Sequence, residues 1–406
     1  MVERLGAVCF AAAVAVALVL PAAAHAAGSN VEVIVNSSLY ASGLIDASLE
    51  QYLADLRVQG FSPTLTTKSF PTPGHLKVHL AGKHNTTGLA GAVLIGDLPS
   101  EQFERYDQFN SPGSYERFAC DHYFMDLDGV WEDNDENEIY DTHSGDMAPE
   151  IWVGRLKVSP LVSLHAGRTE ASLLNDYFQK DHDYRTAQLA SNQNGMAYVD
   201  DDWRNLAAGW AGDLAQSVAG HVDRIDQPAT TTAADYLARL QSQQYESVLL
   251  AAHSSATSHS FKVGSQWTGG TVTSSELAAA NPQALFYNLF ACASGDFTRS
   301  GYIGGEYVFG TVRGLLAVGS TKSGGMLSDG PYYQALGEGD TFGQAFLDWW
   351  GAKAADGIDG GEQDWHYGMT IIGDPTLVAQ HFIPEPATLL MVALAAAAIA
   401  RRRQPA

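Results

Sequence analysis

Short apolar runs that stop abruptly at polar residues constrain the fold of this chain most strongly. A run that is apolar at every position is typical of a strand buried on both faces of a parallel sheet. Stretches with apolar residues at helical spacing lie between these runs, as with Leu49, Leu53 and Leu56. The runs occupy residues 91–95, 195–199, 247–252, 284–291 and 314–318. We therefore expect an α/β protein with mostly parallel sheets.

The strand and helix patterns divide the chain into two α/β halves. The first half begins with the strand-like Val31–Val35 and extends over residues 27–185, with an acidic, loop-rich part near its end. The second half, residues 186–383, contains most of the apolar runs. We expect the second half to be the catalytic subdomain.

The amino end has the features of a secretory signal peptide. A charged start is followed by an apolar stretch from Leu5 to Leu20 and by the small-residue site Ala24-His25-Ala26. These three features in this order predict that signal peptidase removes residues 1–26 and that the mature chain is exported.

The carboxyl end, residues 384–406, resembles a PEP-CTERM sorting tail. Pro384-Glu385-Pro386 is followed by an apolar run, 387–400, and by Arg401-Arg402-Arg403. The run is shorter than the roughly 20 residues of a membrane span, and the arginines favour the cytoplasmic side. The resemblance implies a transient membrane anchor cut by an exosortase, and a place in the cell envelope or extracellular matrix of a Gram-negative bacterium. An ordinary C-terminal membrane anchor is the alternative.

Charge and cysteine content narrow the range of functions. Asp and Glu number 46 against 23 Lys and Arg, which gives a net charge of −23. Such a chain repels phosphate backbones, so we expect no nucleic-acid partner.

Cys9 lies in the predicted signal peptide, which leaves Cys120 and Cys292 for the mature chain. No disulfide framework is expected, although a single bridge between these two remains open.

His253 and Cys292 directly follow two of the apolar runs. Neighbouring parallel strands lie about 5 Å apart, and ligands bind at their carboxyl edge. A histidine beside a cysteine generates the thiolate that attacks acyl groups. The pattern predicts a Cys-His dyad, with His259 as the rival base. A purely structural Cys292 and a dyad of Cys120 with His122 are the alternatives.

Two segments carry a resemblance to the gingipain family of caspase-related cysteine peptidases. They are Leu249-Leu-Ala-Ala-His253-Ser254 and Phe290-Ala-Cys292-Ala-Ser-Gly295. The resemblance implies a three-layer caspase-like fold and an exported endopeptidase that cleaves protein or peptide substrates through a thioester. It also implies an oxyanion hole made by the backbone N–H groups of Ser254 and Cys292. The family usually has glycine where this chain has Ser254.

Asp200, Asp201 and Asp202 follow the run at residues 195–199. In caspase-like relatives, the residue that selects the side chain before the scissile bond lies in this region. Three carboxylates there predict a preference for Arg or Lys through charge-assisted hydrogen bonds. A solvated turn that caps the following helix is the alternative.

The acidic part of the first half resembles the start of a calcium loop. Side-chain oxygens stand at positions 1, 3, 5 and 9 of such a loop, which are Asp133, Asp135, Asn137 and Asp141. We expect a structural Ca²⁺ and no cofactor for catalysis. Glu138 stands where the loop usually has glycine, so a solvated acidic loop is the alternative.

Two other functions fit the same residues. A catalytically inactive envelope or matrix binding protein would keep the fold, with Ser254 marking a lost site. A zinc metallohydrolase would use His253, His259, His366 and Cys292 as ligands.

Overall fold

The computed structural model describes residues 29–355 and 357–383. The predicted signal peptide, 1–26, and the predicted sorting tail, 384–406, lie outside these residues. Within the described ranges, no helix is both long enough and apolar enough to cross a membrane.

A ten-stranded sheet in the order β10-β9-β11-β15-β16-β17-β8-β3-β1-β2 organises the fold. All neighbours pair in parallel except β16 and β17, which are antiparallel. The strands are β1 (Asn30–Val35), β2 (Ser62–Thr67), β3 (Leu89–Ile95), β8 (Trp152–Leu156), β9 (Gly195–Val199), β10 (Val222–Ile225), β11 (Ser247–Ala251), β15 (Phe286–Phe290), β16 (Leu316–Ser320) and β17 (Met369–Gly373). The predicted α/β class with a mostly parallel sheet is confirmed.

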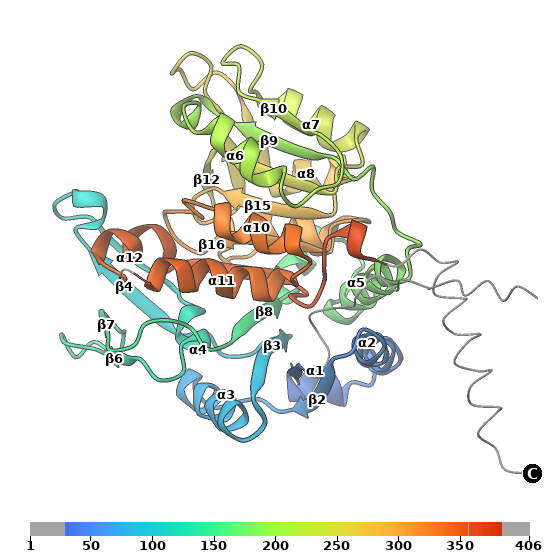
Figure 1. Cartoon of the computed structure of the whole chain (residues 1–406), viewed down its shortest axis with the longest axis vertical. Coiled ribbons are helices and arrows are strands. Elements are labelled where there is room, and N and C mark those ends of the chain that lie inside the picture. Colours follow the sequence, from blue (N-terminus) through green and yellow to red (C-terminus); the bar gives the residue numbers. More distant parts are fainter. Residues whose placement is uncertain (1–28, 356, 384–406) are drawn as a thin grey trace, which may run out of the picture.

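Helices cover both faces of this sheet (Figure 1). One face packs against α2 (Asp46–Val58), α5 (Glu170–Arg185), α7 (Ala233–Ser242) and α8 (Ser274–Ala280). The other packs against α3 (Pro73–Thr87), α6 (Ala207–Leu214), α10 (Gly330–Glu338) and α11 (Phe342–Ala354). Strand residues alternate between the two cores, as Met196 and Tyr198 do with Ala197 and Val199. The result is the predicted three-layer architecture.

Shorter helices and strands lie around the central sheet. The short helices are α1 (Ser37–Ala41), α4 (His122–Met125), α9 (Ile303–Gly305) and α12 (Gly360–His366). The short strands form three small antiparallel sheets: β4 (Gln102–Tyr106) with β5 (Tyr115–Ala119), β6 (Val130–Glu132) with β7 (Thr142–Ser144), and β12 (His253–Ser255) with β13 (Ser258–Ser260) and β14 (Thr271–Thr273).

The two groups of strands expected from the sequence share one continuous sheet. β17 comes from the end of the second half, yet it pairs with β16 on one side and with β8 of the first half on the other. The division at residue 185 remains a prediction, and the hydrogen bonding of the sheet runs across it.

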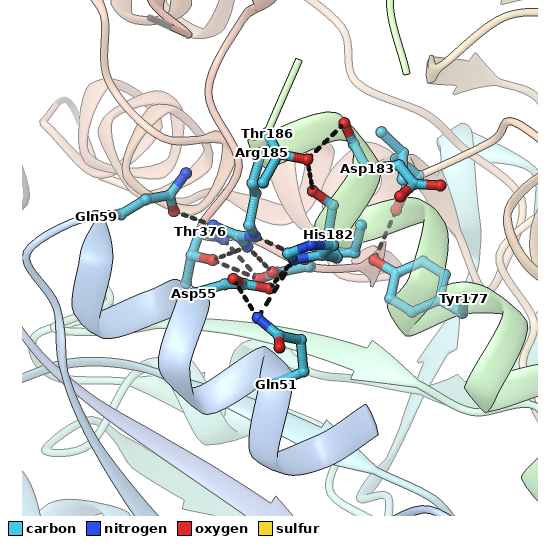
Figure 2. Close-up of polar contacts among 12 residues, drawn as sticks. Gln51, Asp55, Gln59, Tyr177, His182, Asp183, Arg185, Thr186 and Thr376 are labelled. Atoms are coloured by element: carbon cyan, nitrogen blue, oxygen red, sulfur yellow. Dashed lines mark hydrogen bonds and ion pairs between the residues drawn. The ribbon is translucent and has the colours of Figure 1, made fainter. Parts of the chain in front are cut away.

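A buried ionic cluster fixes α5 to the end of β17 (Figure 2). Arg185, the last residue of α5, donates to Asp181 at 2.6 Å and to Thr376 at 2.8 Å, and it also binds Asp374. Gln59, which follows α2, accepts a further hydrogen bond from the same guanidinium. Arg185, Asp181 and Asp374 are buried, so the guanidinium supplies the positive charge for two carboxylates that water does not reach.

Replacing Arg185 by Met is expected to lower the free energy of unfolding by about 3–5 kcal/mol, because Asp181 and Asp374 lose their buried counter-charge. Chemical denaturation measures this loss. Arg299→Met is the control, since Arg299 pairs with Asp296 on the surface and its loss is expected to change stability by less than about 0.5 kcal/mol. Equal effects of the two substitutions would contradict the role given to the cluster.

Candidate active site

The register of β11 and β15 places His253 and Cys292 at one edge of the sheet. These strands are parallel neighbours, with Ala251 opposite Phe290. His253 and Cys292 each stand two residues beyond that pair, so the two side chains start from the same level of adjacent strands. Both residues therefore follow strand ends, as the apolar runs predicted, and the structure shows that these strands are neighbours.

His253 and Cys292 line a common pocket of about 260 Å³. Both side chains are half-buried. The remaining lining residues come from segments far apart in the sequence: Phe109, Trp203, Ala252, Phe290, Ala291, Ser323, Gly324 and Trp365. The pocket therefore lies where the carboxyl ends of the parallel strands meet, as is usual for ligand sites in open α/β sheets.

Asp202 orients His253. Its Oδ2 atom lies 2.7 Å from Nε2 of His253, and Lys262 donates to the same oxygen. Hydrogen bonds from Lys262 and His253 lower the pKa of Asp202, so the carboxylate stays ionised at neutral pH. The imidazole also contacts the rings of Trp203 and Trp267, at centroid distances of 4.6 and 4.8 Å.

Cys292 lies in a tight turn that is anchored by the last residue of β16 and by the segment that follows it. Ala293 has a φ of 54°, in the left-handed region that is unfavourable for residues with a Cβ atom. The N–H of Ala293 donates to the carbonyl of Lys322 at 2.7 Å, and that of Gly295 donates to Ser320 at 2.8 Å. These hydrogen bonds hold the strained turn and thereby fix the position of the thiol.

Lys322 is a cation beside the site that the sequence analysis missed. In the pairing of β15 with β16, Asn288 lies opposite Val318. Cys292 and Lys322 each stand four residues beyond that pair, just after the ends of the two strands. The Lys322 amine is buried, donates to the carbonyl of Asp364 at 2.5 Å, and lies 3.8 Å from Glu116. Burial lowers the pKa of Lys322 to about 8, against the opposite effects of Glu116, Asp364 and Cys292.

Asp200 and Asp201 hold the loop that follows β13. Buried Asp200 accepts the N–H of Lys262 at 3.1 Å, and burial raises the pKa of Asp200 to about 6. Asp201 accepts the N–H of Ser265 at 3.1 Å. Neither residue lines the pocket, and nor does Asp202. In this structure, Asp202 binds His253, and Asp200 and Asp201 bind the backbone of the loop after β13.

Ser254, which stands where gingipains usually have glycine, is paired with His259. The Ser254 hydroxyl lies 2.5 Å from Nδ1 of His259, across the antiparallel pair β12–β13. Burial lowers the pKa of His259 to about 3, so its imidazole stays neutral at physiological pH. His259 does not line the pocket, and His253 does. Of the two candidate bases, His253 is the one that lines the same pocket as Cys292.

Cys120 and His122 do not form an accessible dyad. Both side chains are fully buried, and neither lines the pocket. Burial raises the pKa of Cys120 and lowers that of His122 to about 3, which leaves both groups neutral. Cys120 and Cys292 are both free thiols, so the structure contains no bridge between them.

The predicted calcium ligands are split between two arrangements. Oxygens of Asp135 and Asp141 lie within 4.8 Å of each other and of Glu104, which the sequence analysis missed. The carboxylate of Asp133 accepts the N–H of Asn137 and of Glu138 and so shapes the loop. Partial desolvation and repulsion from Glu104 and Asp133 raise the pKa of Asp135. A calcium ion at this loop stays a prediction, with Glu104 as a further ligand.

Two other groups of metal-ligating side chains occur in the described part of the chain: His122, Asp126 and His143, and Asp126, Asp128 and Glu150. In the first group, Asp126 and His143 lie 2.5 Å apart. That is a hydrogen-bond distance, whereas two ligands at about 2.1 Å from one tetrahedral ion lie roughly 3.4 Å apart. Within the described ranges, no such group contains Cys292, His253, His259 or His366, so the zinc arrangement is not formed there.

The two thiols are expected to differ in reactivity in the native protein. Cys292 is half-buried and opens into the pocket, whereas Cys120 is fully buried. Iodoacetamide is therefore expected to modify Cys292 in the native protein and both residues after unfolding in urea, as read by peptide mass mapping. Rapid native labelling of Cys120 would contradict the structure.

Added calcium is expected to raise the melting temperature by roughly several degrees if the acidic loop binds it, because a ligand of the native state stabilises that state. Asp135→Asn combined with Asp141→Asn is expected to abolish this rise. Glu136→Gln is the control, since Glu136 is an exposed acid of the same loop outside the group. A wild-type melting temperature that is the same in calcium and in chelator would rule the site out.

Comparisons with known proteins agree with this architecture. The PEP-CTERM protein-sorting motif matches residues 382–404. A comparison with curated proteins finds no match. Among solved structures, the Arg-specific cysteine proteinase gingipain R superposes with a TM-score of 0.60 and 15% identity, over 87% of this chain and 78% of that one. The chain therefore has the fold of gingipain R and carries a PEP-CTERM sorting motif, which indicates export and association with the cell envelope of a Gram-negative bacterium.

Proposed function

We propose that this protein is an exported cysteine peptidase in which Cys292 is the nucleophile and His253 the general base. The observation that carries the proposal is the common pocket at the ends of two adjacent parallel strands, which both side chains line. The hydrogen bond from His253 to an ionised Asp202 gives the imidazole a fixed orientation and stabilises its protonated form.

The chemistry is acyl transfer. His253 takes the proton of the Cys292 thiol, and the thiolate attacks the carbonyl carbon of the scissile bond. Since Nε2 of His253 is bound to Asp202, the proton moves to Nδ1. The imidazolium then protonates the leaving amine, the C–N bond breaks, and a thioester remains. Water, deprotonated by the same imidazole, hydrolyses the thioester and restores the thiol.

Two further groups support the charged intermediates in this proposal. The backbone N–H groups of Ser254 and Cys292 are the candidate oxyanion donors, and the Ser254 hydroxyl is paired with His259. Lys322 follows the end of β16 at the same level as Cys292, and it supplies a buried ammonium group beside the proposed nucleophile.

Substitutions in the three side chains test the proposal with a mixed peptide library as substrate and mass spectrometry as readout. Cys292→Ala is expected to abolish cleavage, and His253→Gln to reduce kcat by about 10²–10⁴, the usual contribution of a general base. Asp202→Asn is expected to lower kcat with little change in KM, because it acts on the imidazole and does not line the pocket.

Asp201→Asn is the matched control, since the neighbouring carboxylate binds the Ser265 N–H and does not contact His253. Cleavage that persists in Cys292→Ala would overturn the nucleophile assignment. A wild-type protein whose Cys292 reacts with thiol reagents but which cleaves no peptide would instead favour the non-catalytic binding protein.

A further inference from the structure

The walls of the pocket beside Cys292 are aromatic. Phe109, Trp203, Phe290 and Trp365 contribute rings, and the remaining surface includes Ala252, Ala291 and Gly324. No Asp or Glu is among the lining residues. The surface offered to a substrate side chain is therefore mostly carbon.

The four rings form one connected wall. Phe290 stacks on Trp365 with a centroid distance of 5.6 Å and contacts Trp203 edge-on at 5.7 Å. Phe109 packs edge-on against Trp365 at 4.9 Å. Phe290 belongs to β15 and lies two residues before Cys292, so the wall begins next to the nucleophile. Each such ring pair contributes about 0.5–1.5 kcal/mol beyond the area it buries, which favours this arrangement before substrate binds.

The carboxylates around the pocket are already engaged. Glu116 accepts the N–H of Ser323 at 2.9 Å and lies 3.8 Å from the Lys322 amine. Asp364 accepts the N–H of Phe109 at 2.7 Å and a hydrogen bond from Arg105 at 3.0 Å.

A buried cation close to the wall also disfavours a basic substrate side chain. The Lys322 amine lies 5.1 Å from the centroid of the Phe109 ring. A guanidinium or ammonium group entering the pocket would find ring faces but no carboxylate among the lining residues. The Lys322 charge near Phe109 would repel it, so its lost hydration would be compensated only in part.

The size of the pocket corresponds to one side chain. Its volume of about 260 Å³ lies below the roughly 300–1,000 Å³ of sites for whole small molecules. A large apolar side chain would bury most of its surface against the rings, with its backbone carbonyl near Cys292.

We infer that this pocket selects a large uncharged apolar side chain, aromatic or branched aliphatic, on the residue before the scissile bond. The inference rests on the proposed peptidase function for its catalytic meaning, and it assigns specificity to Phe109, Trp203, Phe290 and Trp365. It replaces the basic preference expected from Asp200, Asp201 and Asp202, and it distinguishes this chain from the Arg-specific proteinase with the same fold.

Matched fluorogenic peptides that differ only in that residue test the inference on the wild-type protein. Peptides with Phe or Leu are expected to give a kcat/KM at least about 10-fold above the peptide with Arg, the discrimination that an apolar pocket achieves. A higher kcat/KM for Arg would overturn the inference.

Binding to Cys292→Ala separates this inference from the peptidase proposal. Short peptides ending in Phe or Arg are titrated while tryptophan fluorescence is followed, because Trp203 and Trp365 line the pocket. Binding at least about 10-fold tighter for Phe is expected. Tight binding of the Phe peptide without turnover in the wild type would refute the peptidase and keep the pocket assignment. Equal or absent binding of both peptides would refute the pocket assignment.

Phe109 allows a matched pair of variants. Its φ of 53° lies in the left-handed region, which Asn and Asp tolerate well. Phe109→Asp and Phe109→Asn therefore differ mainly by one charge at the pocket wall. Relative to Phe109→Asn, Phe109→Asp is expected to improve binding of the Arg peptide several-fold, because it supplies the missing carboxylate. Identical binding of the Arg peptide to both variants would contradict the assignment of Phe109 to the specificity wall.

Discussion

The antiparallel pairing of β17 with β16 determines how the rest of the molecule is arranged. β17 hydrogen-bonds to β16 along its whole length and to β8 on its other side, so it joins the two groups of parallel strands. Because it reverses direction, the strands β8, β3, β1 and β2 run opposite to β9, β11, β15 and β16. The carboxyl ends of the two groups therefore lie at opposite edges of the sheet. His253 and Cys292 follow β11 and β15, which belong to the group that contains β16.

Because of the same reversal, the segment before β17 contacts the pocket and the segment after β17 contacts the buried ionic cluster. Met369, at its start, lies opposite Ser320 at the end of β16, so the residues before β17 reach the edge that carries Cys292. Trp365 enters the pocket wall in this way. At the other end, Asp374 binds the buried Arg185 of α5. One strand thus connects the pocket to the ionic cluster on the far edge.

Sequence patterns were informative where a side chain follows directly from a strand. His253 and Cys292 could be placed because buried parallel strands are apolar at every position and end where polar residues begin. Lys322 could have been found by the same rule, since it follows the apolar run of β16. The sequence offered no such signal for Phe109, Trp365 and Glu104, because the fold brings them to their sites from distant segments. The role of Asp202 depends on its contact with His253, whereas sequence position alone suggested a substrate contact.

The late position of β17 in the chain has a consequence for when the pocket beside Cys292 can form. The partners that β17 brings together are separated by long stretches of chain, with Gly154 opposite Ile371, and such pairings form slowly. A polypeptide that emerges amino end first presents β11 and β15, and with them the thiol and the imidazole, well before residue 365 is available. The pocket wall is then still open on the side of Trp365. The pocket that Cys292 lines is therefore complete only after nearly the whole described region has emerged.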